Sequence, residues 1–376
     1  MVNKIKQDLF SLSSSKIIVL STNGLFWFLM ALILPKEQYG ELTFLLSTAY
    51  LAGTISRFGL DRLIIVFGAK KESVLFPSYV IVTITSSLAA IIVYYFTNDV
   101  FVGLLVVFIV IFELTLADFI SKSKYQMFSI YEIIRRSLSL VLSILFFFEF
   151  GIMGIFMGFI LANLLGIKGL IKALRVRQEF SNLKQHSGFI FNTSLIGLIA
   201  SIDQFASKIL IGSMFGFSLL GSIQVSFQYL IFLGFIPSVL ALYLLPQESQ
   251  GKKNKKLKIY SIIICIILSF VSILTIPFIV NTLLPEYTES ISAMQIMSFS
   301  IIPSIIIAII ETSFIGNNQT KFTLIAKVIQ VCIFFGLIMT LGKQFGLDGL
   351  AYSFLIAVII MCASYVVLYI KYFKKN

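Results

Sequence analysis

Charged residues are scarce in this chain: 12% of its 376 residues are Asp, Glu, Lys or Arg, against about 25% in an average soluble domain. Short alternating apolar segments, which a transmembrane β-barrel would need, are also absent. Hydrophobic residues make up 58% of the chain and fall in long uncharged blocks. Each block approaches the roughly 20 residues with which an α-helix crosses about 30 Å of hydrocarbon. The sequence therefore predicts an all-α, polytopic membrane protein and excludes a soluble domain of useful size.

Side chains that carry enzyme chemistry are equally rare. The three cysteines, Cys265, Cys332 and Cys362, each lie inside an apolar block, and their spacing supports neither a disulfide nor a metal site. The single histidine, His186, falls in a polar segment, where we expect it to be a solvated loop residue. No nucleotide-binding loop, zinc spacing or nucleophile elbow occurs. We therefore expect a protein that is not an enzyme and needs no cofactor or metal.

The net charge of +12 could indicate a nucleic-acid partner, but the distribution of the basic residues argues for a membrane instead. The start of the chain is basic and polar and lacks a signal-peptide cleavage site. Lys and Arg then concentrate in alternate loops, and the remaining turns hold essentially Lys36 and Lys343. An excess of basic residues marks cytoplasmic loops. We therefore predict that both termini are cytoplasmic and that nucleic acid is not a partner.

Apolar blocks and the breaks between them predict about twelve crossings. Their approximate bounds are 17–34, 39–67, 76–96, 100–120, 130–150, 152–171, 189–211, 219–245, 259–284, 291–315, 322–341 and 347–370. The segment 173–188 is basic and polar, and we interpret it as a cytoplasmic linker. It would separate an N-terminal six-helix bundle, residues 1–172, from a C-terminal six-helix bundle, residues 189–376.

Two stretches suggest an internal repeat. The sequence FGIMGIFMGFILA at 150–162 matches FGLDGLAYSFLIA at 345–357, and each opens the last predicted helix of its half. A weaker match relates Gly40, at the start of the second predicted helix, to Gly221, at the start of the eighth. Six crossings per half would give the halves the same orientation, related by an axis along the membrane normal. Chance similarity between apolar segments is the alternative.

The second predicted helix carries three charges inside a membrane crossing: Arg57, Asp61 and Arg62. A charge at mid-membrane costs about 2.5–3.5 kcal/mol on insertion scales, so these side chains should face protein or water. Arg57 and Asp61 are four apart and can pair on one helix face, which leaves Arg62 without a partner in its own helix. The sequence favours a hydrated cavity with a cationic wall. The alternative is a structural cluster that fixes the helix to a neighbour.

Other intramembrane charges are candidates of the same kind. Lys208 would be a second anion contact, with Asp203 as its partner or as an H+ or Na+ site; the alternative is a buried pair that holds helices together. Glu311 is either a coupling-ion carboxylate or a side chain that reaches the inner surface.

Helix five carries Arg135 and Arg136 near its predicted inner end. They could gather lipid headgroups at the inner mouth of a cavity. The alternative, which we favour, is pairing across helices with carboxylates at similar depth. Glu132 lies on the same helix as the two arginines, and Glu113 and Asp118 lie at a similar depth on helix four.

Two longer stretches resemble a known family. Residues 35–72, PKEQYGELTFLLSTAYLAGTISRFGLDRLIIVFGAKKE, and residues 201–246, which contain Asp203, Leu220-Gly221 and a closing Pro246, are similar to polysaccharide flippases of the O-antigen (Wzx) type. These belong to the multidrug, oligosaccharidyl-lipid and polysaccharide exporter superfamily. The resemblance implies two six-helix bundles around a central cavity in the bacterial cytoplasmic (inner) membrane. It also implies flipping of an undecaprenyl-pyrophosphate-linked oligosaccharide, an O-antigen or capsule repeat unit, from the inner to the outer leaflet.

An anionic diphosphate favours guanidinium and ammonium groups on the cavity wall. We therefore expect Arg62 to be the main phosphate contact, and the resemblance to lipid II flippases, in which a basic residue near this part of helix two is functional, supports that choice. Arg57, Lys208, Arg135 and Arg136 are the further candidates. Asp61, Asp203 and Glu311 are the expected charge partners or coupling-ion sites, and an H+ or Na+ gradient is the expected energy source.

Two rival functions remain open. A multidrug antiporter of the same fold would prefer an acidic lumen for organic cations, whereas helix two carries net positive charge. An envelope-glycan polymerase or ligase would need a large outer loop, and every predicted outer turn is short.

Overall fold

The protein is helical throughout the part of the chain that its computed structural model describes, namely residues 2–176, 180–235, 237–240, 244, 255–316 and 319–373, and no strand occurs there. Eight helical segments in this part of the chain are long and apolar enough to cross a membrane, and some of them include more than one of the helices labelled below. Within the described residues, each predicted crossing coincides with helical segments, and the predicted crossing 219–245 is described in part only, mainly by Phe217–Leu233. This confirms an all-α polytopic membrane protein.

The chain folds into two compact units. Unit 1 contains residues Met1–Trp27 and Phe44–Ile209, and unit 2 contains Phe28–Thr43 and Leu210–Asn376. The boundary between the units therefore lies inside α11 and does not coincide with the predicted linker at 173–188. The division of the chain into two sequence halves stays a prediction.

Helices α1 to α11 supply unit 1 and two pieces of unit 2, namely Phe28–Thr43 and the part of α11 that begins at Leu210. Their bounds are α1 Val2–Ile33, α2 Lys36–Arg57, α3 Leu60–Ala69, α4 Leu75–Thr97, α5 Val100–Ser121, α6 Tyr125–Phe150, α7 Ile152–Asn163, α8 Ile167–Arg175, α9 Ser181–Gln185, α10 Ser187–Ser201 and α11 Ser207–Phe215. Helix α5 packs against α3, α4, α6, α7 and α8. Most of its side chains are buried, so α5 is the centre of unit 1.

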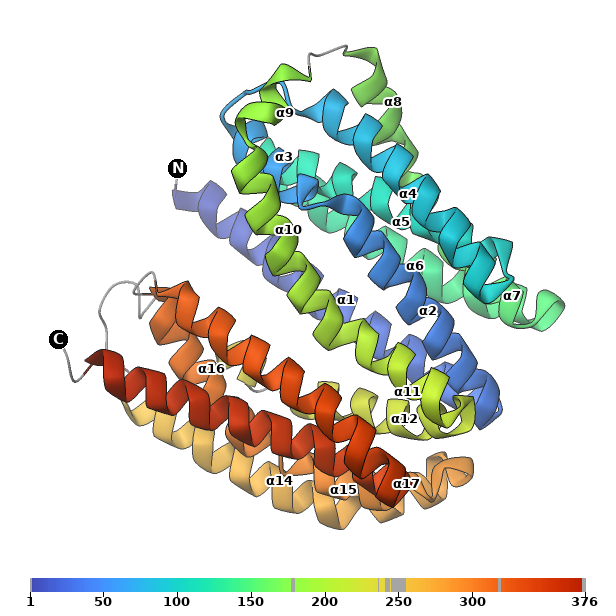
Figure 1. The fold of residues 1–376 in the computed structure, drawn as a ribbon, viewed down its shortest axis with the longest axis vertical. Helices are drawn as coiled ribbons and strands as arrows, with labels where there is room; N and C mark the ends of the chain where they lie inside the picture. The colour runs from blue at the N-terminus through green and yellow to red at the C-terminus, as the bar shows by residue number, and fades with distance from the viewer. Residues whose placement is uncertain are drawn as a thin grey trace. The chain divides into compact units, whose positions relative to one another are not determined.

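The remaining helices build the rest of unit 2. They are α12 Phe217–Leu233, α14 Lys255–Leu283, α15 Ser290–Ser298, α16 Ile301–Gly316 and α17 Thr320–Phe373. Helix α16 packs against α14 and α17, and α15 packs against α12, α14 and α17 (Figure 1). The basic loop segment 246–254 lies outside the described residues.

Several predicted crossings are interrupted rather than continuous. The second one breaks at Phe58 and Gly59, whose φ angles of 48° and 67° are left-handed. A π-helical segment, Ile202–Ala206, separates α10 from α11, and the tenth crossing divides into α15 and α16. Pro303 is the third residue of α16, where proline is better tolerated than in a helix interior, so it does not mark a mid-helix kink.

The internal repeat has a structural counterpart. Gly151 and Gly346 adopt closely similar backbone angles, φ 62° and ψ −144° against φ 56° and ψ −125°. Three residues later, a methyl group on Gly154 would come within 2.1 Å of the Phe146 carbonyl oxygen, and one on Gly349 within 2.0 Å of the Leu341 carbonyl oxygen. In both copies, glycine therefore lets the helix after the turn pack on the backbone of the helix before it.

Gly40 and Gly221, the weaker match of the repeat, lie at a direct contact between α2 and α12 within unit 2. A methyl group on Gly40 would lie 1.8 Å from the Phe217 carbonyl oxygen, and one on Gly221 would lie 2.2 Å from the Lys36 carbonyl oxygen. Each glycine thus faces the carbonyl four residues before the other. Small residues permit this kind of close backbone approach between membrane helices.

The expectation of a solvated loop histidine is wrong. His186 Nε2 lies 2.6 Å from Glu72 Oε2, and its ring stacks on Phe67 with centroids 3.6 Å apart. The predicted linker is largely helical, because α8 extends to Arg175 and α9 and the start of α10 follow. Its residues 177–179 are outside the described ranges. The linker is therefore attached to the end of α3.

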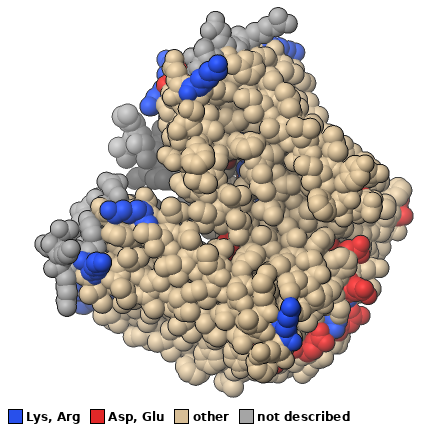
Figure 2. Space-filling view, in the orientation of Figure 1, with Lys and Arg blue, Asp and Glu red and all other residues tan. Residues whose placement is uncertain are grey.

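Charge separates along unit 2. On the face shown in Figure 2, Lys and Arg side chains lie at the end that carries the C-terminus, and acidic side chains with a few basic ones lie at the opposite end. In unit 1, the turn between the end of α5 and the start of α6 is likewise basic, with Lys122 and Lys124.

Candidate functional site

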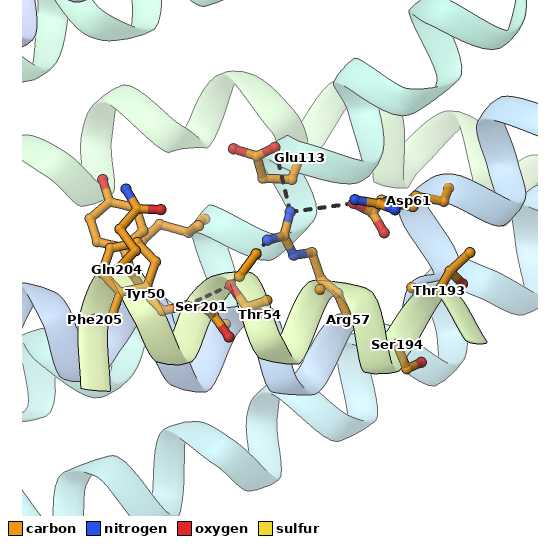
Figure 3. Close-up of a pocket in the computed structure, with 16 residues that line it drawn as sticks. Tyr50, Thr54, Arg57, Asp61, Glu113, Thr193, Ser194, Ser201, Gln204 and Phe205 are labelled. Atoms are coloured by element: carbon orange, nitrogen blue, oxygen red, sulfur yellow. Dashed lines mark hydrogen bonds and ion pairs between the residues drawn. The ribbon is translucent and has the colours of Figure 1, made fainter. Parts of the chain in front are cut away.

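A polar cavity of about 290 Å³ lies inside unit 1, where α2 ends and α3 begins. Helices α5 and α10 and the π-helical segment complete its wall (Figure 3). The charged residues of the lining are Arg57, Asp61, Arg62 and Glu113. The sequence predicted three of these four to share a site.

Arg57 lies between two carboxylates. Its Nη1 is 3.6 Å from Asp61 Oδ2 and 3.6 Å from Glu113 Oε2, and its Nη2 donates to Thr54 Oγ1 at 3.2 Å. Figure 3 shows the guanidinium directed at both carboxylates. The Nε atom is buried without a hydrogen-bond partner. The predicted pairing of Arg57 with Asp61 is confirmed, and the cation is shared with a second helix.

Arg62 differs from Arg57 in both exposure and partners. It lies in the first turn of α3, lines the same cavity and is exposed. Among the residues that the structure describes, none forms an ion pair or hydrogen bond with its guanidinium. The cavity therefore offers one cation that is already neutralised and one that is free to bind an anion.

The rest of the wall is uncharged and rich in hydrogen-bonding groups. Helix α10 and the π-helical segment contribute Thr193, Ser194, Ser201 and Gln204. The rings of Tyr50 and Phe205 stack, with centroids 5.4 Å apart and planes at 11°. Such a wall can bind hydroxyl and amide groups beside a charged group.

The break between α2 and α3 explains how these groups come together. Gly59 adopts φ 67°, and a side chain there would meet Thr193 Oγ1 at 2.4 Å. Glycine therefore provides the left-handed turn and lets α10 pack against it. The turn places Arg57 at the end of one helix and Arg62 at the start of the next.

Arg135 and Arg136 do not line this cavity. The Arg135 side chain is 1% exposed and forms a bidentate pair with Glu132, with contacts of 2.7 to 3.1 Å, and its guanidinium lies 4.7 Å from the Phe112 ring centroid. Arg136 donates to Asn23 at 3.4 Å, and its Nε is buried without a partner. Arg135 is enclosed in this conformation. A role for either arginine in substrate binding stays a prediction.

Asp203 and Lys208 lie at the π-helical segment and the start of α11. No ion pair joins Lys208 to Asp203 or to another residue in the described ranges. The predicted buried pair is therefore not formed. Lys208 is a half-buried cation next to an irregular stretch of helix, and its role as an anion contact stays a prediction.

Glu311 on α16 is paired with Lys327 on α17, with Nζ 3.3 Å from Oε1. The structure thus gives this carboxylate a partner in the neighbouring helix, and a coupling-ion role stays a prediction. Asp118 is similarly paired: Lys172 Nζ lies 2.8 Å from its Oδ2, and Lys122 binds its other oxygen. One carboxylate of each unit, Asp118 in unit 1 and Glu311 in unit 2, therefore pairs with lysine.

Glu113 is the charged residue of the cavity whose partner was not predicted from the sequence. Pairing across helices was expected for Glu113, but Arg57 was not identified as its partner. An acidic residue in the middle of the apolar α5 signals a cation on a neighbouring helix, although sequence alone does not show which one. Within the described residues, no three His, Cys, Asp or Glu side chains gather to hold a metal ion.

No protein-family model matches this chain, and the comparison with curated proteins found no match either. Solved structures do match. The chain is similar to the lipid II flippase MurJ in an inward closed conformation, with a TM-score of 0.76, 14% identity, and coverage of 95% of this chain and 86% of that one.

It is also similar to a multidrug resistance MATE family transporter of the MOP superfamily. The inward-facing form gives a TM-score of 0.64 at 15% identity and covers 95% of each chain. The outward-facing form gives a TM-score of 0.57 at 14% identity and covers 99% of this chain and 97% of that one. The chain therefore has the fold shared by the MurJ flippase and the MATE transporters of the MOP superfamily.

Proposed function

We propose that this protein is a flippase that moves an undecaprenyl-pyrophosphate-linked oligosaccharide, an O-antigen or capsule repeat unit, from the inner to the outer leaflet by alternating access. Two observations support the proposal: the polar cavity of unit 1 and the structural similarity to MurJ, which is a lipid II flippase. A lipid-linked substrate needs a wet path for its sugar and diphosphate, because neither can enter hydrocarbon.

The observation that carries this proposal is Arg62. A free guanidinium in a membrane-embedded polar cavity costs energy unless it serves a ligand, and its planar donor array suits bidentate contact with a phosphate. Arg62 lines the cavity with no partner among the described side chains. We therefore assign it the main contact with the diphosphate.

Arg57 is suited to bind the diphosphate after Arg62. Its contacts with Asp61 and Glu113 are both 3.6 Å long, which is beyond the range of a good charge-assisted hydrogen bond of about 2.7–2.9 Å. A diphosphate oxygen could therefore replace one carboxylate at low cost. The displaced carboxylate, Asp61 or Glu113, would then be a suitable H+ or Na+ site for coupling.

We place the protein in the bacterial cytoplasmic membrane with both termini cytoplasmic. Basic side chains near the C-terminus in unit 2 (Figure 2) and at the turn between α5 and α6 in unit 1 support this orientation, because cytoplasmic ends of membrane helices carry the excess of Lys and Arg. The two compact units would move against each other during transport.

A multidrug antiporter is the second candidate function. The likeness to MATE transporters supports it, and so does the aromatic stack of Tyr50 and Phe205 beside two carboxylates. Arg62 opposes it, because its guanidinium has no carboxylate partner among the described residues and repels an organic cation.

The test uses a strain that lacks the gene and carries variants of it. Arg62→Ala should abolish surface polysaccharide while the protein inserts at normal levels. Arg62→Lys should restore part of the activity, because it retains the charge without the planar fork. Surface glycan is measured by immunoblot and protein level by membrane fractionation.

The matched control is Arg175→Ala, since Arg175 is an exposed arginine outside the cavity; it should leave glycan unchanged. Normal glycan with Arg62→Ala would remove Arg62 from the site. Drug efflux by the reconstituted protein, with no flipping of a fluorescent undecaprenyl-diphosphate oligosaccharide, would establish the antiporter instead.

A further inference from the structure

A second cavity, of about 380 Å³, lies in unit 2, at the turns between α11 and α12, before α15, and within α17. Its size is within the range of about 300–1,000 Å³ typical of small-molecule sites. Two phenyl rings, Phe215 and Phe345, and two carboxylates, Glu289 and Asp348, are part of its lining. The Ser218 hydroxyl is exposed in the same wall.

Glu289 is held in place by two neighbouring helices. Its Oε1 accepts from Lys36 Nζ at 2.9 Å and from Ser222 Oγ at 2.6 Å. The Ser290 hydroxyl donates to the Ser222 carbonyl oxygen at 3.1 Å and closes the network. The side chain of Glu289 is still 53% exposed, and its Oε2 has no hydrogen bond with the described residues. One oxygen therefore fixes the carboxylate, and the other can accept from a ligand.

Asp348 provides the second acceptor. It is half-buried, and none of the described residues forms an ion pair or hydrogen bond with its carboxylate. It follows Gly346, whose left-handed φ of 56° turns the chain inside α17. The turn brings Phe345, Leu347 and Asp348 to the cavity from one short segment.

The phenyl rings are placed by two similar turns. Phe215 precedes Gly216, which has φ 86°, and its ring packs so close to Gly342 that a methyl group there would lie 3.0 Å from it. Phe345 precedes Gly346 and is 60% exposed. Exposed aromatic side chains are common at helix ends in membrane proteins; here the exposed ring shares one cavity wall with Phe215.

We propose that this cavity is a saccharide-binding site on the outer side of the membrane. A sugar ring presents hydroxyl donors around its edge and C–H bonds on its faces. Carboxylate oxygens accept from the hydroxyls, and electron-rich phenyl faces pack against the C–H groups. The proposal rests on the proposed function for its ligand class: the site would bind the oligosaccharide of the substrate after it reaches the outer leaflet.

The number of hydrogen-bonding groups in the lining favours a sugar over an organic cation. Lys36 already neutralises Glu289, so Asp348 is the one carboxylate of the described lining whose charge is not balanced by a neighbour. Apolar organic cations also need an enclosed apolar pocket, whereas this lining contains Glu289, Asp348 and Ser218. A hydroxyl-rich ligand satisfies these groups without adding charge.

The test measures saturation-transfer NMR on the full-length protein in nanodiscs. The probes are soluble methyl glycosides of a hexose, a 6-deoxyhexose and an N-acetylhexosamine, which carry neither lipid nor phosphate. We expect at least one glycoside to bind. Asp348→Asn should weaken that binding about tenfold, as the loss of one charge-assisted hydrogen bond would. Phe345→Ala, which removes the ring that packs against the sugar C–H groups, should weaken it by about the same factor. Phe278→Ala and Glu149→Gln are the matched controls, because both side chains are exposed and lie outside the cavity.

Two outcomes would overturn the saccharide site: no glycoside binds, or tetraphenylphosphonium binds instead and is lost with the same two variants. Size-exclusion chromatography and a melting curve show that each variant is folded. Because the probes lack lipid and phosphate, their binding is independent of the flipping assay. If a glycoside binds but the protein does not flip the lipid-linked oligosaccharide, the flippase proposal is rejected and the saccharide site is retained. If the protein flips the lipid-linked oligosaccharide but no glycoside binds, the saccharide site is rejected and the flippase proposal is retained.

Discussion

Two arginines five positions apart have different environments in unit 1. Arg57 is shared between Asp61 and Glu113, and its side chain is 19% exposed. Arg62 is exposed and lacks a described partner. The difference arises from the break at Gly59, which ends one helix and begins another between them. Sequence spacing predicted the Arg57–Asp61 pair, because a four-residue step survives the break. The Glu113 contact depends on how α5 packs, which spacing does not encode.

Arg57→Ala should destabilise the protein by about 1–3 kcal/mol, because it leaves two partly buried carboxylates without their cation. Adding Glu113→Gln should recover part of this loss, since one uncompensated charge is then removed. Chemical unfolding in mixed micelles measures both variants. If the double variant is no more stable than Arg57→Ala, the two side chains are not coupled in the folded protein.

Glu289 should make stability depend on pH. Burial raises the pKa of Glu289, but the hydrogen bonds from Ser222 and Lys36 and the charge of Lys36 lower it by more, so the net shift is downward. A carboxyl with a lowered folded-state pKa stabilises the protein above its ordinary pKa, about 4.3, and this stabilisation is lost as pH falls through the lowered value.

Glu289→Gln should therefore lower the melting temperature at pH 7, and the difference from the parent should shrink as pH falls below about 4. Melting curves in detergent across this range test the effect, and Glu149→Gln is the control, since Glu149 is exposed at the end of α6. A constant difference between Glu289→Gln and the parent at all pH values would contradict the assignment.

Helices in this protein are shaped by glycine at several of the places where they break or cross. Gly59, Gly151 and Gly346 adopt left-handed φ angles, and Gly40 and Gly221 let α2 and α12 touch through backbone atoms. The apolar blocks predicted where helices lie, because hydrophobic length is explicit in sequence. They did not predict the breaks at Gly59 or at the π-helical segment Ile202–Ala206, because local glycine and hydroxyl content is compatible with a straight membrane helix.

Gly40→Ala and Gly221→Ala should each cost about 1–3 kcal/mol, the usual range for overpacking, because the added methyl group would lie 1.8 or 2.2 Å from a carbonyl oxygen of the facing helix. Gly336→Ala is the matched control: nothing lies within 4 Å of a methyl group there, and alanine favours a helix. It should be neutral or stabilising. Equal effects at all three positions would mean that the crossing is not this close.

The whole chain has the fold of MurJ and MATE transporters at 14–15% identity. Hydropathy and loop charge predicted a polytopic helical membrane protein, because both follow directly from the bilayer as a solvent. Composition could not predict the compact units, since residues Phe28–Thr43 belong with the second one. Only packing assigns the start of α2 to unit 2 and its end to unit 1.

The predicted orientation can be tested by cysteine labelling in intact cells. In a Cys332→Ser background, Asn98→Cys should react with a membrane-impermeant maleimide, because the turn between α4 and α5 is expected outside. Ser123→Cys, between α5 and α6, should react only after permeabilisation. The two native cysteines that remain, Cys265 and Cys362, are buried. The reverse pattern would place both termini outside.

The crossing of α2 and α12 also constrains how this sequence can change over time. A larger residue at one position of a packed pair is usually compensated by a smaller one opposite. Gly40 and Gly221 each face main-chain atoms of the other helix, and no amino acid is smaller than glycine. We therefore expect relatives that retain this crossing to retain both glycines, and relatives that lose one to have spread these helices apart.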